Sequence, residues 1–78
     1  MPREPSPDWI IRRRQAIGDR IRARREASNL TQEQLSYRTG ITRLTIQRIE
    51  SGATDARISW LLRIAADLDA PLADLLGE

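Results

Sequence analysis

The sequence predicts an all-α protein, a compact bundle of five helices around one core. Apolar residues recur at the spacing of a helix face, as at Ile41, Ile46 and Ile49, and no stretch alternates in the manner of a strand. Capping residues and glycines bracket several of these stretches, which is how helices begin and end. With 78 residues the chain fits one domain, near the lower size at which a core alone can stabilise a fold.

The composition argues against catalysis and against a metal site. The chain contains no cysteine and no histidine, so it lacks thiolate ligands, the commonest metal-binding side chain and the commonest general base. We therefore expect no enzyme, no metal and no cofactor. No apolar run approaches the ~20 residues of a membrane span, and the opening MPREPSPD does not resemble a signal peptide. The expected location is the cytoplasm, without membrane contact.

The first residues predict a flexible arm that leads into a helix. Residues 1–8 are charged and proline-rich, whereas residues 9–78 carry the helical patterns, so we place the domain boundary between them. Ser6 fits a helix N-cap, with Pro7 as the first helical residue and Asp8 in the first turn.

The first helix is expected at about residues 9–28. Ile10, Ile17 and Ile21 form one apolar stripe along it. Gly18 lies in the middle of this helix, where a glycine costs about 1 kcal/mol relative to alanine. We interpret it as a close contact with another element or as a weak point.

The second helix has the clearest start signal in the chain, the stretch LTQEQL. Thr31 can cap the N-terminus and Gln34 stands three residues later, which is the spacing of a capping box. Leu30 and Leu35 fit a hydrophobic staple around the same turn. Gly40 supplies a left-handed stop, so this helix is short.

The third helix is expected at about residues 42–51, with Thr42 as its N-cap and Gly52 as its stop. Only a tight turn fits between the second and third helices. Two short helices joined by a glycine-containing turn form a helix-turn-helix unit.

The fourth and fifth helices complete the predicted bundle. Asp55 is the expected N-cap of a helix at about residues 56–68, and Pro71 opens a last short helix that ends at Gly77. The predicted inner face of the fourth helix carries Ile58, Leu61, Leu62, Ala65 and Leu68.

The third helix has one face without a core role. Leu35 and Ile41 fit between the second and third helices, while Ile46 and Ile49 hold the third helix inward. In a helix-turn-helix unit the N-terminal half of the second helix of the pair enters the major groove of DNA. The residues left on the outer face are Arg43, Leu44, Thr45 and Arg48.

The stretch LTQEQLSYRTGITRLTIQRIESG resembles the signature of the Cro/repressor-type helix-turn-helix family, also called lambda-repressor-like or XRE-type. The resemblance extends to IGDRIRARREASN upstream and ISWLLRIAADLDAPLADLL downstream, so it covers roughly residues 16–76. It implies a five-helix bundle and a sequence-specific, double-stranded-DNA-binding transcriptional regulator, a repressor or autoregulator. The chain departs from the family pattern at Trp60, Asp69 and Pro71 and in its longer first helix.

The resemblance also implies a role for individual residues. Arg43, Leu44, Thr45 and Arg48 would face base edges, where an arginine can donate two hydrogen bonds to guanine and a leucine can meet a thymine methyl. The residues that would contact phosphates are Gln32, Thr42 and Arg57. Arg25 and Glu50 would form a structural ion pair between the first and third helices.

We expect a homodimer on a two-fold operator, since a short last helix leaves apolar surface to cover. The expected interface residues are Trp60, Leu72, Leu75 and Leu76. The alternative is a protein-interaction module of the same fold, antitoxin-like, with incidental DNA binding. The charge distribution bears on both functions: residues 1–57 hold twelve Arg against seven acids, and residues 58–78 hold one Arg against four acids. A basic face suits a polyanion and an acidic face suits a protein partner.

Overall fold

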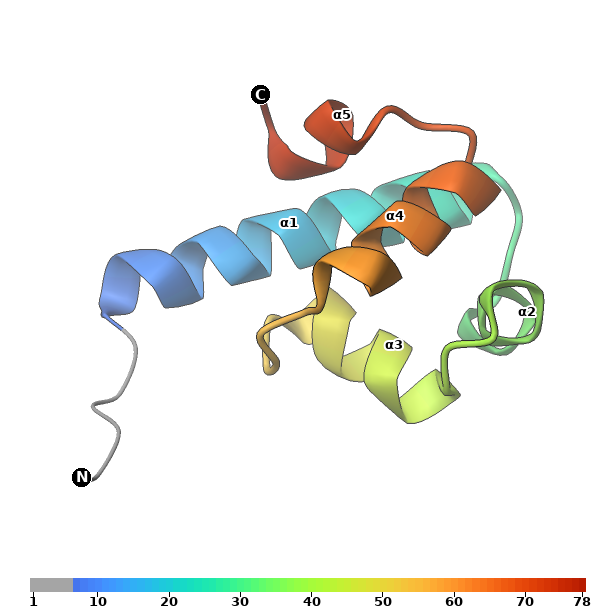
Figure 1. The fold of residues 1–78 in the computed structure, drawn as a ribbon, viewed down its shortest axis with the longest axis horizontal. Helices are drawn as coiled ribbons and strands as arrows, with labels where there is room; N and C mark the ends of the chain where they lie inside the picture. Colours follow the sequence, from blue (N-terminus) through green and yellow to red (C-terminus); the bar gives the residue numbers. More distant parts are fainter. Residues whose placement is uncertain (1–6) are drawn as a thin grey trace.

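The long helix α1, Asp8–Ala27, is the element against which the bundle is built. The computed structural model describes residues 7–78, and within them the fold is all-α. In Figure 1, α5 lies above α1, α2 and α3 lie below it, and α4 crosses in front. The other helices are α2 Gln32–Thr39, α3 Arg43–Ser51, α4 Ile58–Asp67 and α5 Leu72–Leu76. The predicted five-helix architecture is confirmed for this part of the chain.

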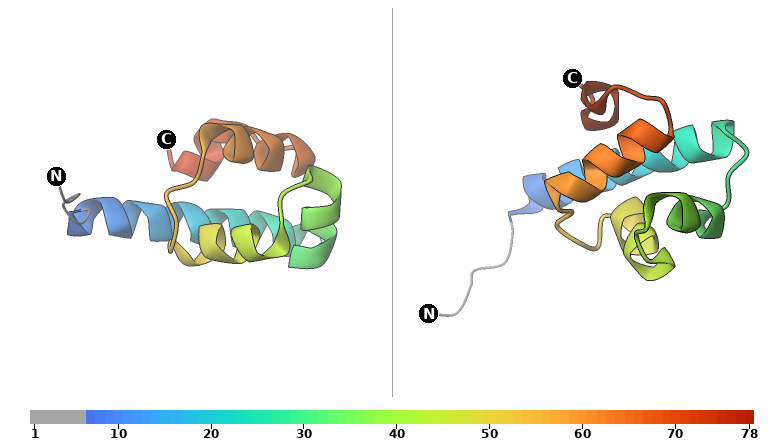
Figure 2. Two further views of the ribbon diagram at one scale, coloured as in Figure 1. Left: turned by 60° about the horizontal axis from the view of Figure 1, so that its bottom comes forward. Right: turned by 45° about the vertical axis from the view of Figure 1, so that its right-hand side comes forward.

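One fully buried side chain from each helix meets at the centre of the bundle. Figure 2 shows α4 and α5 on one side of α1, with α2 and α3 toward the other. Burying a side chain of this size contributes about 1.5–3 kcal/mol, so all five helices depend on the same core. The five residues are Ile21, Leu35, Ile46, Ile64 and Leu75.

Leu75 therefore corrects the predicted dimer interface. Its side chain has no solvent exposure in the single chain, because α5 turns it onto the core beside α1 and α4. A buried core residue offers no surface to a second copy. Leu72, Leu76 and Trp60 are half-buried and keep part of their side chains at the surface.

α1 begins one residue earlier than predicted. Asp8 is its first residue and Pro7 is its N-cap, without a side-chain hydrogen bond to the helix. Asp8, which was assigned to the arm, belongs to α1, and Pro7 is not the first helical residue. Ser6, the predicted cap, and the rest of the predicted arm lie outside the described residues.

Gly18 marks the closest approach of two helices. A Cβ atom added there would overlap the backbone carbonyl oxygens of Ile49 and Glu50 at the end of α3. The close contact predicted from the sequence is confirmed. Only a residue without a side chain lets α3 lie this near to α1.

α4 differs from its prediction in its start and in its inner face. Arg57, not Asp55, is the N-cap, and no side chain caps the helix. Ile58 is 71% exposed and Leu62 is 52% exposed, while Ile64 is fully buried. The buried side of α4 consists of Ile64, Ala65 and Leu68. Leu62 and Ile58 precede Ile64 by two and six positions, which places them on the opposite side of the helix. The predicted inward position of Ile58 and Leu62 is wrong.

None of the helices in residues 7–78 combines the length and the apolar character needed to span a bilayer.

Candidate nucleic-acid interface

The ends of α2 are fixed by the residues that the sequence indicated. The Thr31 side chain accepts a hydrogen bond from the backbone N–H of Gln34 at 3.0 Å, and the Gln34 side chain accepts one from the backbone N–H of Thr31 at 2.8 Å. This reciprocal pair is the predicted capping box. At the other end, Gly40 adopts a left-handed conformation with φ of 75°. Both predictions are confirmed.

The ends of α3 are fixed in the same manner. The hydroxyl of Thr42 accepts a hydrogen bond from the backbone N–H of Thr45 at 3.2 Å. Gly52 ends the helix with φ of 77°. These two residues are the predicted cap and stop, so the direction in which α3 leaves the turn is set locally.

The turn between α2 and α3 is held by two hydroxyl groups. Thr39 donates from its side chain to the carbonyl oxygen of Leu35 at 2.7 Å, and Ser36 donates to the carbonyl oxygen of Ile41. The sequence predicted no role for either hydroxyl. A hydroxyl residue in the last turn of a short helix was the available signal, because such residues readily bond nearby backbone groups.

The outer face of α3 presents side chains that no core contact requires. Arg43, Leu44 and Arg48 are exposed, Leu44 with 53% of its surface accessible. Thr45 is half-buried, and its oxygen accepts a hydrogen bond from the Thr42 hydroxyl at 2.8 Å. Within residues 7–78, neither Arg43 nor Arg48 forms an ion pair or a side-chain hydrogen bond. The four predicted base-contacting residues therefore share one helix, with both guanidinium groups available to a ligand.

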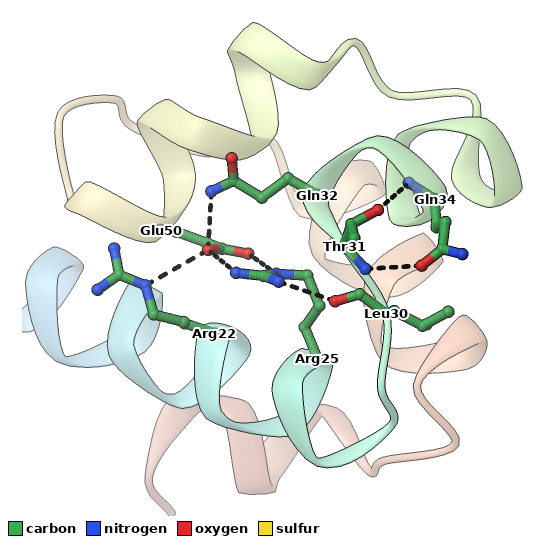
Figure 3. A network of polar contacts seen from close by, with 7 residues as sticks. All are labelled: Arg22, Arg25, Leu30, Thr31, Gln32, Gln34 and Glu50. Carbon is green, nitrogen blue, oxygen red and sulfur yellow. Dashed lines mark hydrogen bonds and ion pairs between the residues drawn. The ribbon is translucent and has the colours of Figure 1, made fainter.

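A buried ion pair connects this helix to α1. Arg25 Nε lies 2.7 Å from Glu50 Oε2, and Arg25 Nη2 lies 3.0 Å from Glu50 Oε1, which is a two-pronged contact (Figure 3). Arg25 Nη1 also donates to the carbonyl oxygen of Leu30 at 2.8 Å. Glu50 is only 1% exposed. The predicted ion pair is confirmed, and it joins α1, the loop before α2, and α3.

Burial alone raises the pKa of the Glu50 carboxyl, since a low-dielectric site disfavours charge. Hydrogen bonds from Arg25, Gln32 and Arg22 and the charge of Arg25 outweigh burial, so the pKa of Glu50 lies below its ordinary value. The hydrogen bond to Glu50 in turn raises the pKa of Arg25. Both groups are therefore charged near neutral pH, and the pair is a fixed ionic link.

Two further side chains reach the same carboxylate. Gln32 Nε2 donates to Glu50 Oε1 at 3.1 Å, and Arg22 Nε lies 3.5 Å from that oxygen. Gln32 was predicted to contact phosphate, and part of its amide is engaged within the protein. Arg22 was not singled out from the sequence. Its position three residues before Arg25, on the same side of a helix, was the signal that could have found it.

Arg57 and Trp60 are in contact, although the sequence predicted different roles for them. Arg57 was expected to contact phosphate and Trp60 to lie in the dimer interface. The guanidinium carbon of Arg57 lies 5.2 Å from the centroid of the Trp60 ring, within range of a cation–π interaction. Arg57 is exposed and stands at the start of α4. The contact restrains an arginine whose predicted partner is a phosphate.

Comparison with known proteins identifies the family. The model of a family described as helix-turn-helix domain matches residues 16–76. A protein from Methanocella arvoryzae, named as an HTH-type transcriptional regulatory protein, is 39% identical over 56 residues. That match covers 72% of this chain and 17% of the relative, so the chain spans about a sixth of that relative's length.

Two crystal structures are similar to the fold. The restriction-modification controller protein C.AhdI from Aeromonas hydrophila is 29% identical with a TM-score of 0.77, and the match covers 80% of this chain and 94% of the controller. An HTH_3 family transcriptional regulator from Vibrio cholerae has a TM-score of 0.79 at 20% identity, covering 87% of this chain and 38% of that one. The second similarity bears on the fold alone.

Proposed function

The chain belongs to the helix-turn-helix domain family, as the resemblance predicted, and we propose that it is a sequence-specific transcriptional regulator that binds double-stranded DNA. The observation that carries the proposal is the outer face of α3. Arg43, Leu44 and Arg48 are exposed together on a helix whose two ends are fixed by Thr42 and Gly52. Such a helix can enter the major groove as a rigid unit.

Each side chain of that face has a base-reading capacity. Arg43 and Arg48 can each donate two parallel hydrogen bonds to guanine O6 and N7. Leu44 can contact the methyl group of thymine, and we propose that Thr45 meets the border between bases and backbone. Because these contacts differ between base pairs, the face can distinguish sequences and not only bind charge.

Phosphate contacts would set the position of α3 in the groove. Gln32 stands in the first turn of α2, Thr42 is exposed at the start of α3, and Arg57 is exposed at the start of α4. The three residues thus come from three separate elements, and the Thr42 hydroxyl hydrogen is already donated to Thr45. Contacts of this kind fix register and orientation without reading sequence.

The similarity to a controller protein supports gene regulation as the biological role. The match covers 94% of that protein, which points to a regulator built on this domain. We propose a repressor or autoregulator that acts in the cytoplasm. The acidic second part of the chain keeps a protein-interaction module as the competing function.

A homodimer is part of the proposal, with α4 as its main contact. Ile58 and Leu62 are exposed one helical turn apart, and Ala66 continues the same face. Trp60, Leu72 and Leu76 are half-buried and could extend the contact. A two-fold dimer would place the two α3 helices about 34 Å apart, on one side of the DNA.

A binding titration tests the function. The protein is titrated with its preferred duplex, selected from random sequences, and with an unrelated duplex at several salt concentrations. We expect tight binding to the selected duplex, weaker binding to the unrelated one, and a steep loss of affinity with salt. Absence of binding to any duplex at low salt would reject DNA regulation and favour the protein-interaction module.

A further inference from the structure

Arg22 and Gln32 converge on one oxygen atom from two different helices. Arg22 Nε lies 3.5 Å from Glu50 Oε1, and Gln32 Nε2 donates to the same oxygen at 3.1 Å. Figure 3 shows the two remaining nitrogens of Arg22 on the side away from Glu50. The Arg22 side chain is 48% exposed, so its outer nitrogens are accessible.

The positive charge of Arg22 is in excess within this network. Arg25 makes a two-pronged contact with Glu50 and uses its third nitrogen on Leu30, so the carboxylate is already neutralised. Arg22, Arg25 and Glu50 alone carry a net charge of about +1, and Glu26 also acts on Arg25 through its charge. Within residues 7–78, the contact of Arg22 with Glu50 is made through Nε, and no side-chain hydrogen bond engages its Nη1 or Nη2. An anion at that spot would meet the unused Nη1 and Nη2 donors of Arg22.

A structural role accounts for only part of Arg22. Its guanidinium is half-exposed and lies 3.5 Å from a buried carboxylate that Arg25 approaches to 2.7 Å, and its effect on the pKa of Glu50 is the smallest of those that lower it. Removal of Arg22 would leave Glu50 paired with Arg25 at 2.7 Å and bonded by Gln32. The buried Glu50 carboxylate therefore keeps its main charge partner and a hydrogen bond when Arg22 is removed.

We propose that Arg22 and Gln32 together bind one phosphodiester group of the DNA backbone. The proposal rests on the proposed function and adds to it a backbone contact from α1. A guanidinium presents two parallel N–H groups that match two phosphate oxygens, and the Gln32 amide has a second hydrogen to donate.

The link through Glu50 gives this site a positioning role. Glu50 belongs to α3, and both Arg22 and Gln32 contact its carboxylate. A phosphate held by these two side chains is therefore held at a fixed place relative to the recognition helix. Arg22 acts on the backbone and reads no base.

The test compares Arg22→Gln with Arg24→Gln. Arg24 is a matched control because it lies on the same helix with a similar exposure, 46%, but pairs with Asp74 of α5 at 2.8 Å. Binding to the selected and to an unrelated duplex is measured from low to high salt. For Arg22→Gln we expect the slope of log K against log salt to become shallower by about 0.9, the value for one lost phosphate contact.

The loss of one phosphate contact should lower the affinity of Arg22→Gln about tenfold at 0.1 M salt. The loss is expected to be equal for both duplexes, so the preference for the selected duplex is unchanged. Arg24→Gln is expected to keep the wild-type slope. Arg22→Lys keeps the positive charge and is expected to keep the wild-type slope. A wild-type slope in Arg22→Lys shows that a change at this position does not by itself unfold the protein.

Three results would overturn the site. Arg22→Gln with the wild-type slope shows no phosphate contact, and Arg22→Gln with an altered sequence preference assigns Arg22 to bases. Arg22→Lys with the shallow slope of Arg22→Gln shows that charge is not what the site supplies. Wild-type protein that binds no duplex would instead reject the proposed function, and the site with it, which distinguishes the two failures.

Discussion

The pair of Arg25 and Glu50 links the stability of the fold to the placement of its recognition helix. The carboxylate is buried on α3 and receives hydrogen bonds from α1 and α2. Loss of either charge would leave the other without its partner in a low-dielectric site. The pair therefore acts as a single structural unit.

We predict that Glu50→Gln lowers the free energy of unfolding by about 3–5 kcal/mol, because the Arg25 charge remains buried without a counter-ion. Urea denaturation at neutral pH measures the change. The control is Asp74→Asn, which removes an exposed pair with Arg24 and is expected to cost at most about 1 kcal/mol. Equal costs for the two variants would show that the buried pair has no special role.

The pH dependence of stability gives a second prediction for the same residue. Glu50 has a folded pKa below its ordinary value of 4.5, so its contribution is complete above that value and is lost as the pH falls through the folded pKa. The difference in unfolding free energy between wild type and Glu50→Gln should therefore be largest near neutral pH. It should shrink in urea titrations below pH 4.5. A difference that grows on acidification would contradict the assigned charge state.

At the scale of elements, the contact of α1 with α3 depends on one glycine. Gly18 faces the last carbonyl groups of α3, and any side chain there would push α3 outward. The position of α3 is also fixed by its caps and by the hydroxyl bonds of the turn. The recognition helix is thus held at both ends and along its inner side.

We predict that Gly18→Ala destabilises the protein by about 1–3 kcal/mol, the cost of forcing extra atoms into a packed contact. Helix propensity alone would predict a gain of about 1 kcal/mol, so the sign of the effect is diagnostic. Thermal and urea unfolding measure it. At Ala23, which is exposed on the same helix, the reverse change Ala23→Gly should follow propensity and lower stability. A more stable Gly18→Ala would disprove the close contact.

The sequence predicted α2 and α3 closely because their end signals are local. Thr31, Gly40, Thr42 and Gly52 each act on backbone groups a few residues away, so their effect does not depend on the rest of the fold. The pair of Arg25 and Glu50 came from the family resemblance. The i, i+3 spacing of Arg22 and Arg25 places both on one side of α1. That both side chains meet Glu50 depends on the crossing of α1 and α3, which no local pattern encodes.

α4 was predicted less well for the same physical reason. Its first turn has no side-chain cap, so nothing local marked Ile58 as the start. The helix also carries more apolar residues than its buried face needs, and periodicity alone did not decide which ones turn inward. The core contacts of Ile64 with the other helices made that choice.

At the scale of the whole molecule, the exposed apolar face of α4 is a candidate interaction surface. Ile58 and Leu62 are 71% and 52% exposed on one side of the helix. Such a face on a chain of which 31% is charged is typical of an interaction surface. A second copy would cover it and pair two recognition helices.

We predict that Leu62→Glu shifts the protein to monomers, because two like charges would meet near the two-fold axis in an apolar contact. Analytical ultracentrifugation over a range of concentrations measures the association. Tyr37→Ser is the control, since Tyr37 is 91% exposed and belongs to α2, not to the proposed contact on α4. Wild-type protein that remains monomeric at high concentration would reject the α4 interface.

Base-pair discrimination by Arg43→Ala tests most directly whether the outer face of α3 reads DNA sequence. Affinities of wild type and variant are measured on the selected duplex and on all single base-pair changes, with Arg24→Ala as the control. We predict that Arg43→Ala loses discrimination at one or two base pairs, by about 1–3 kcal/mol each, while Arg24→Ala keeps the wild-type profile. An unchanged profile for Arg43→Ala would contradict the placement of the recognition helix.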